Sequence, residues 1–149
     1  MLDSTAQKTN FYYSLKKYII DNLYTIQGIP VIFDTFLPPD FSIERWISVH
    51  QKSLDRDTLS SYQIEIYCIT RNDYEGDKLT ELVDIVAGYF IGDTTQTDGL
   101  RRIPFYDAIT ELQNGNMIVT NANEGEHLQA PDESKFLILT FTLRMASKI

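Results

Sequence analysis

Hydrophobic positions near the start of the chain recur at the spacing of a helix and predict one long helix, from about Thr5 to Gln27. Gly28 and Pro30 supply a stop signal after it. The stripe expected to pack on the core comprises Phe11, Leu15, Tyr18, Ile19, Leu23 and Ile26. A second stripe lies on another side of the cylinder and comprises Tyr13, Ile20 and Tyr24. We expect this second stripe to contact a neighbouring copy; burial within a wide core-facing surface is the alternative.

Alternating apolar and polar residues predict strands at 31–37, 45–50 and 61–70, with a polar hairpin tip from Gln51 to Ser60 between the last two. In the strand at 61–70, one face is apolar and carries Tyr62, Ile64, Ile66 and Cys68. The opposite face carries Gln63, Glu65, Tyr67 and Ile69 and is mixed. This second face is therefore not a plainly solvated one.

A second amphipathic helix follows, with Asp73 as its expected cap and Gly92 as its end. Its apolar face comprises Leu79, Leu82, Val83, Val86 and Phe90. The segment 101–107 reads as an edge strand because Pro104 cannot donate a ladder hydrogen bond. Residues 108–134 are rich in Asn, Thr and Gly and predict a long, flexible loop with one short strand at 117–119.

The segment 135–145 predicts the last strand, and it is apolar on both faces in its first half. Such a strand is central in its sheet, or its second face meets another subunit. Together these elements predict a single domain over residues 1–149 of the α+β class. It has two layers, with two main helices packed on one face of a mostly antiparallel, mixed sheet.

The formal net charge of −8 is concentrated in two regions. Residues 72–99 contain seven acidic residues and one lysine, and residues 103–134 contain six acidic residues and no base. This balance argues against a surface that grips nucleic-acid phosphates, which requires clustered Lys and Arg. A solubilising surface explains it, and so does a wall that DNA passes without binding.

The single cysteine, Cys68, excludes an internal disulfide and lies in an apolar run where a thiol acts as a small hydrophobic group. The chain shows no signal peptide and no apolar stretch of about 20 residues. We therefore expect a soluble protein made in a reducing cytoplasm, without a membrane partner.

No catalytic or metal-binding motif stands out, and the two histidines, His50 and His127, lack neighbouring ligands at metal-binding spacing. Both are expected to be exposed, with His50 at a strand end. Asp34 and His50 could be posed as catalytic groups, but an acidic chain yields such pairs readily. We expect no enzyme activity, no cofactor and no metal.

Few residues are basic, so their positions are informative. Arg101 and Arg102 are candidates for a subunit interface, while Lys52 and Arg56 are candidates for contact with a tube or neck protein. Isolated charges on solvated loops are the simpler interpretation. The second group of apolar interface candidates comprises Trp46, Tyr67, Phe136 and Ile138.

The order of elements, with the hairpin WISVHQKSLDRDTLSSYQIEIYCITR, the helix DKLTELVDIVAGYF and the segment RRIPFYD, resembles the tail terminator (tail-completion) proteins of long-tailed bacteriophages. The resemblance spans about residues 10–146. It implies a structural protein without catalytic residues that forms a six-fold ring in the virion. The ring caps the tail tube, stops its polymerisation, provides a surface for the head-completion protein and lets DNA pass through its channel.

Two other functions remain as alternatives. The first is a head-completion or connector protein of the neck, with the ring on the capsid side. The second and less favoured is an enzyme or small-ligand domain that uses Asp34, His50 and their neighbours.

Overall fold

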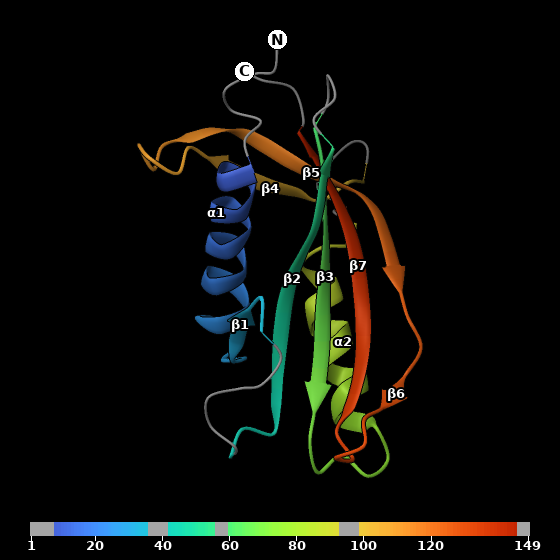
Figure 1. Ribbon diagram of the computed structural model, residues 1–149. Helices are drawn as coiled ribbons and strands as arrows, with labels where there is room; N and C mark the ends of the chain where they lie inside the picture. The colour runs from blue at the N-terminus through green and yellow to red at the C-terminus, as the bar shows by residue number, and fades with distance from the viewer. Residues whose placement is uncertain (1–7, 36–41, 56–59, 93–98, 146–149) are drawn as a thin grey trace.

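The computed structural model describes residues 8–35, 42–55, 60–92 and 99–145 (Figure 1). Its elements are α1 (Lys8–Ile19), the π-helical turn η1 (Ile20–Tyr24), β1 (Val31–Phe33), β2 (Arg45–Asp55), β3 (Ser61–Thr70), α2 (Asp77–Gly88), β4 (Arg102–Tyr106), β5 (Gln113–Glu124), β6 (Leu128–Gln129) and β7 (Lys135–Met145).

All the strands join one seven-stranded sheet in the order β1-β2-β3-β7-β5-β4, with β6 also paired to β7. The β1–β2 pair is parallel and the other pairs are antiparallel. One buried core lies between the helices and the sheet. The α+β class and the mixed, mostly antiparallel sheet are therefore confirmed.

The pairing of β3 with β7 runs without a bulge over ten residue pairs, from Ser61 opposite Arg144 to Thr70 opposite Lys135. The bounds of β7 and its central position are as the sequence predicted, since β7 lies between β3 and β5. The residues that face the helices from these two strands are almost completely buried: Tyr62, Ile64, Ile66, Cys68, Leu137, Leu139, Phe141 and Leu143.

The first helix differs from the prediction near its end. Phe11, Leu15, Ile19 and Leu23 are fully buried as expected, but Ile26 is 66% exposed. The helix turns into the wider π form at Ile20–Tyr24 and ends there. A π turn adds a residue to the repeat and so shifts the face that later positions occupy. This shift explains why the expectation for Ile26 was wrong.

Two strand bounds also differ. The described part of the first predicted strand is Val31–Phe33, three residues long. The second strand does not end at His50 but continues through the predicted polar tip to Asp55, with a bulge between Gln51 and Ser53. Backbone pairing with the start of β3 stabilises this polar extension, although its side chains carry no clear strand pattern.

The largest correction concerns residues 108–134, which the sequence predicted to be a loop with one short strand at 117–119. They contain the twelve-residue strand β5, Gln113–Glu124, and the short strand β6. The Asn-rich sequence of β5 has low strand propensity, but its backbone pairs with both β4 and β7. The edge position predicted for the Pro104 strand is confirmed, because β4 ends the sheet.

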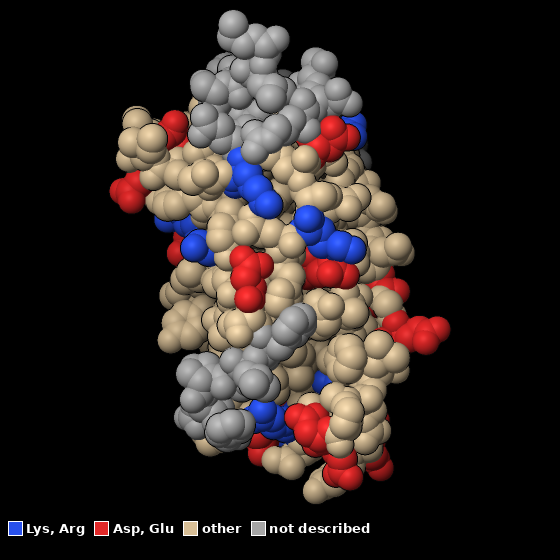
Figure 2. Space-filling model, in the orientation of Figure 1, with Lys and Arg blue, Asp and Glu red and all other residues tan. Residues whose placement is uncertain are grey.

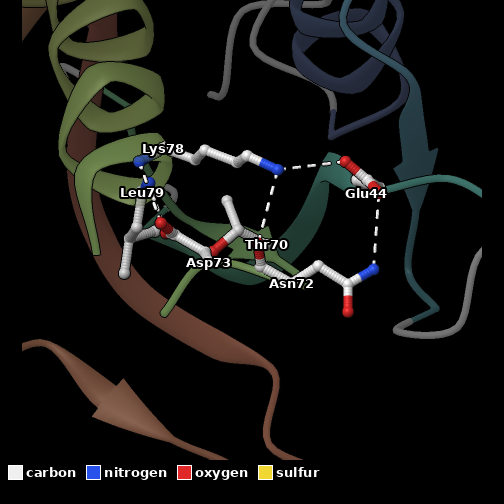
Figure 3. A network of polar contacts seen from close by, with 6 residues as sticks. All are labelled: Glu44, Thr70, Asn72, Asp73, Lys78 and Leu79. Atoms are coloured by element: carbon white, nitrogen blue, oxygen red, sulfur yellow. Dashed lines mark hydrogen bonds and ion pairs between the residues drawn. The ribbon is translucent and has the colours of Figure 1, made fainter. Parts of the chain in front are cut away.

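The second helix begins at Asp77, four residues after the expected cap. Asp73 nevertheless caps it: its carboxylate accepts hydrogen bonds from the N–H groups of Lys78 at 3.1 Å and Leu79 at 2.9 Å, and from the Thr70 hydroxyl at 3.0 Å (Figure 3). The Lys78 ammonium also reaches Glu44 at 3.0 Å. These contacts attach the start of α2 to the last residue of β3, Thr70, and to Glu44, which comes just before β2.

Burial raises the pKa of Asp73, but the hydrogen bonds from Leu79, Lys78 and Thr70 stabilise the charged carboxylate more, so the pKa lies below its usual value. A lowered pKa in the folded state stabilises the fold at neutral pH. This contribution is lost as the pH falls through that pKa.

We predict that Asp73→Ala lowers the free energy of unfolding by about 1–2 kcal/mol at pH 7, because two helix N–H groups lose their acceptor. Urea titration followed by circular dichroism measures the effect. The matched control is Asp84→Ala, at an exposed position of α2, which should change stability little. The difference from wild type should shrink as the pH is lowered below 4; a constant difference would contradict the assigned role of the carboxylate.

Candidate interaction surface

The sheet has a second face, here called the open face, formed by the β2, β3 and β7 residues that point away from the helices. Strand register sets its side chains in rows. Trp46, Ile69 and Phe136 form one row, and Ser48, Tyr67 and Ile138 form the next. The following row is polar and contains His50, Glu65 and Thr140. The structure thus brings together the four predicted candidates Trp46, Tyr67, Phe136 and Ile138.

The apolar rows border a hollow of about 440 Å³ whose opposite wall is the turn between β6 and β7. Ile69, Tyr67 and Phe136 lie on one side, and Ala130 and Pro131 on the other. The Tyr67 and Phe136 rings stack at 6.2 Å between centroids. The hollow is therefore lined mainly by apolar and aromatic groups, as binding sites for apolar side chains are.

Trp46 needs a correction as an interface residue. It is only 2% exposed, and the Arg71 guanidinium is among the groups packed on it, 4.7 Å from the centre of its ring. Trp46 forms the floor of the hollow, and half-buried Tyr67, Phe136 and Ile138 present more surface to a partner. The stacking of Arg71 depends on tertiary structure and has no signal in the strand pattern.

The second stripe of the first helix is partly available. Ile20 is 39% exposed and Tyr24 is 57% exposed, and the misassigned Ile26 lies nearby in sequence. Tyr13 is half-buried, with its ring packed edge-on against the Tyr106 ring at 6.4 Å. An exposed apolar group therefore exists on this helix, at its C-terminal end.

The basic candidates have contacts within the chain. Arg101 donates a hydrogen bond from Nη2 to the Gly88 carbonyl at 2.8 Å, at the C-terminal end of α2, where a positive charge suits the helix dipole. Arg102 is half-buried in β4. Lys52 forms an ion pair with Glu65 at 3.8 Å, and Arg56 lies outside the described residues. The roles predicted for these residues at an interface stay predictions.

Asp34 lies in a polar cluster at the edge of the sheet. It accepts hydrogen bonds from the Tyr12 hydroxyl at 3.1 Å and from the Gln51 side chain at 3.2 Å, while the Tyr62 hydroxyl bonds Gln51 at 2.7 Å. Burial raises the pKa of Asp34, but these donors outweigh it and lower the pKa. Burial and the neighbouring Asp34 raise the pKa of Tyr12 to about 12. The cluster joins α1, β2 and β3.

His50 was expected at an exposed strand end, but it lies half-buried within β2. Its Nε2 is 2.6 Å from the Ser48 hydroxyl, and its ring packs edge-on against Tyr67 at 5.2 Å. Ser48 is fully buried and donates to the Thr35 carbonyl. Ser48 and His50 are thus in contact, and Asp34 is near enough to His50 to interact with it electrostatically. The Ser48 hydroxyl, however, is enclosed and bonded to the backbone. The bond from Ser48 attaches the chain just after β1, at Thr35, to β2. His127 is exposed, as predicted.

Sequence reasoning missed the two most exposed large aliphatic residues of the described ranges, Ile109 at 92% and Leu112 at 69% exposure. They lie in the hairpin tip, residues 107–112, between β4 and β5. Two large aliphatic residues three positions apart in a polar segment were the available signal. It was overlooked because the segment was read as part of a long loop.

The charged side chains on the side shown in Figure 2 are mixed, and most of the basic groups lie next to acidic ones. In Figure 1 α2 lies behind β3 and β7, so both views look onto the open side of the sheet. Charge of one sign is thus not concentrated on this side.

Among the described residues, no group of three or more His, Cys, Asp or Glu side chains is arranged to hold a metal ion. Within the same ranges, no helix has the length and apolar character needed to cross a membrane.

Comparison with known proteins supports the fold. No protein-family model matches the sequence, and no curated protein sequence aligns with it significantly. A solved structure, of a protein designated only by a sequence label, aligns over 96% of this chain and 98% of its own, with a TM-score of 0.65 and 9% identity. At that identity the match shows a shared fold alone.

A second solved structure is a chain from the virion of a native gene transfer agent particle. It is 15% identical and covers 91% of each chain, with a TM-score of 0.48. This overlap is too small to carry an argument about function.

Cys68 is fully enclosed in the core, and its burial raises the pKa of the thiol. We predict that a thiol reagent such as DTNB leaves the native protein unmodified at pH 8 and reacts with one thiol per chain in guanidinium chloride. An Ile91→Cys variant, with a cysteine at an exposed position, is the control and should react at once in the native state. Rapid modification of the native wild type would show that β3 opens readily.

Proposed function

We propose that this chain is the tail terminator of a long-tailed bacteriophage. Copies form a ring, six-fold in the family that the sequence resembles, at the head-proximal end of the tail. The ring caps the tube of the tail tube protein, stops its polymerisation and presents a surface to the head-completion protein. It acts through its position in the virion, after synthesis in the host cytoplasm, without catalysis, cofactor or membrane.

The observation that carries the proposal is the apolar surface of the open face, formed by the half-buried side chains of Tyr67, Phe136 and Ile138. A monomeric two-layer domain gains little from apolar residues on the side of the sheet that neither of the described helices covers. The exposed Ile20 and Tyr24 supply a second, different apolar patch on the same chain. A cyclic ring requires two such patches, because its contacts join different surfaces of neighbouring subunits.

The distribution of charge agrees with this role. An excess of acidic groups repels DNA phosphates, so DNA could slide through a channel made by such subunits without specific binding. We expect no DNA retention by the purified ring at physiological salt.

The test is co-expression with the cognate tail tube protein, followed by negative-stain electron microscopy. Wild-type protein should form rings at tube ends and give tubes of limited length. Ile138→Lys places a charge in the apolar rows and should abolish ring formation. The tubes should then grow to unlimited length. Thr142→Lys, on the same face of the same strand, is the matched control and should leave both unchanged.

Circular dichroism of both variants establishes that they are folded. Tubes of unlimited length in the presence of the wild-type protein would refute the proposal. Co-purification with tail-less heads instead of tubes would favour the head-completion alternative.

A further inference from the structure

The hairpin tip, residues 107–112, is a turn held by several hydrogen bonds. The Asp107 carboxylate accepts hydrogen bonds from the N–H groups of Ile109 at 2.8 Å and Thr110 at 3.0 Å. Backbone bonds join Asp107 N–H to the Leu112 carbonyl at 3.0 Å and Glu111 N–H to the Asp107 carbonyl at 2.8 Å. Ile109 and Leu112 are therefore held in one conformation while they face solvent.

The tip is also braced from α1. Asn10, only 5% exposed, accepts a hydrogen bond from the Ala108 N–H at 3.0 Å. Ser14, fully buried, accepts one from the Tyr106 N–H at 2.7 Å. A pre-ordered apolar projection loses little conformational freedom when it binds, which favours binding.

The tip and the hollow lie far apart on the same chain. Figure 1 shows the β4–β5 hairpin projecting beside the upper end of α1, whereas the β6–β7 turn that walls the hollow lies at the lower right. One chain cannot fill its own hollow with its own tip. Two copies can make this contact.

The two surfaces match in chemistry. The tip offers two aliphatic side chains, and the hollow of about 440 Å³ is lined by Trp46, Tyr67 and Phe136. Glu111, exposed at the tip, is opposite in charge to Arg71, which lines the hollow. The wall also contains Asp132, whose carboxylate is already bonded by the Ser134 N–H and hydroxyl.

We infer that the hairpin tip of one copy inserts Ile109 and Leu112 into the hollow of the next copy. This contact is head-to-tail, so its repetition closes a ring or extends a filament. The inference rests on the proposed ring and assigns to it a specific subunit contact. It assigns an occupant to the hollow, which is the part of the open face beside Trp46, namely the neighbour's hairpin tip.

The experiment uses two single-substitution variants, Ile109→Cys and Ala130→Cys, which place thiols on the tip and on the hollow wall. Mixed and mildly oxidised, they should form a disulfide-linked heterodimer that neither variant forms alone. Native Cys68 is enclosed and does not take part. The matched control is Ile91→Cys mixed with Ala130→Cys, which should give no comparable product. Absence of the Ile109–Ala130 product, or equal yield in the control, overturns the inference.

A second measurement uses the double variant Ile109→Ser/Leu112→Ser. Its self-association by sedimentation should be weaker than that of the wild type by about tenfold or more, because two buried contacts are lost. Trp46, the only tryptophan in the chain, lies on the floor of the hollow and should report association through a fluorescence change that the variant lacks. Ile91→Ser is the control and should associate like the wild type.

The outcomes separate this contact from the function. If the double variant forms rings and limits tube length as the wild type does, the contact is refuted and the tail-terminator proposal stands. If the disulfide forms as expected but the wild type does not limit tube length, the contact stands and the tail-terminator proposal fails.

Discussion

The antiparallel pairing of β3 with β7 is the constraint on which the rest of the structure depends. Its uninterrupted ten-pair register sends Leu137, Leu139 and Phe141 toward the helices. Because side chains alternate along a strand, the same register forces Phe136 and Ile138 to the opposite side. A shift of β7 by one residue relative to β3 would exchange these two sets and turn Leu137 and Leu139 away from the helices. The closed core and the open apolar face therefore arise from one pairing.

The two faces of this pairing have different coverage. Phe11 of α1 packs against Tyr62 at 5.3 Å, and Phe90, just after α2, stacks on Phe141 at 4.6 Å, so the helix side is closed by aromatic contacts. On the other side, the β6–β7 turn covers only the end of the sheet near Trp46 and leaves the hollow beside it. The incomplete covering makes this side suited to a partner.

The sequence predicted best where the pattern was long and the packing simple. The bounds of β7 follow from eleven residues of nearly continuous strand signal, and the buried faces of both helices follow from their spacing. Only residues 117–119 of β5 were predicted as a strand, because the stability of its remaining length comes from partners on both sides and not from its Asn-rich residues. The shielding of Trp46 by Arg71 and the display of Ile109 depend on contacts between distant segments. No periodicity along the chain records such contacts.

Two buried polar residues in α1 connect the core to the hairpin tip. Asn10 and Ser14 occupy the side of α1 that faces the sheet, where apolar residues would give a simpler core. Each instead accepts a hydrogen bond from the backbone at or near the end of β4. A buried polar group with its partner satisfied fixes one arrangement of the chain and rejects alternatives. The polar positions in α1 therefore have a consequence far from the core: they set the direction in which the β4–β5 hairpin projects. The placement of Ile109 and Leu112 is thus a property of the whole fold.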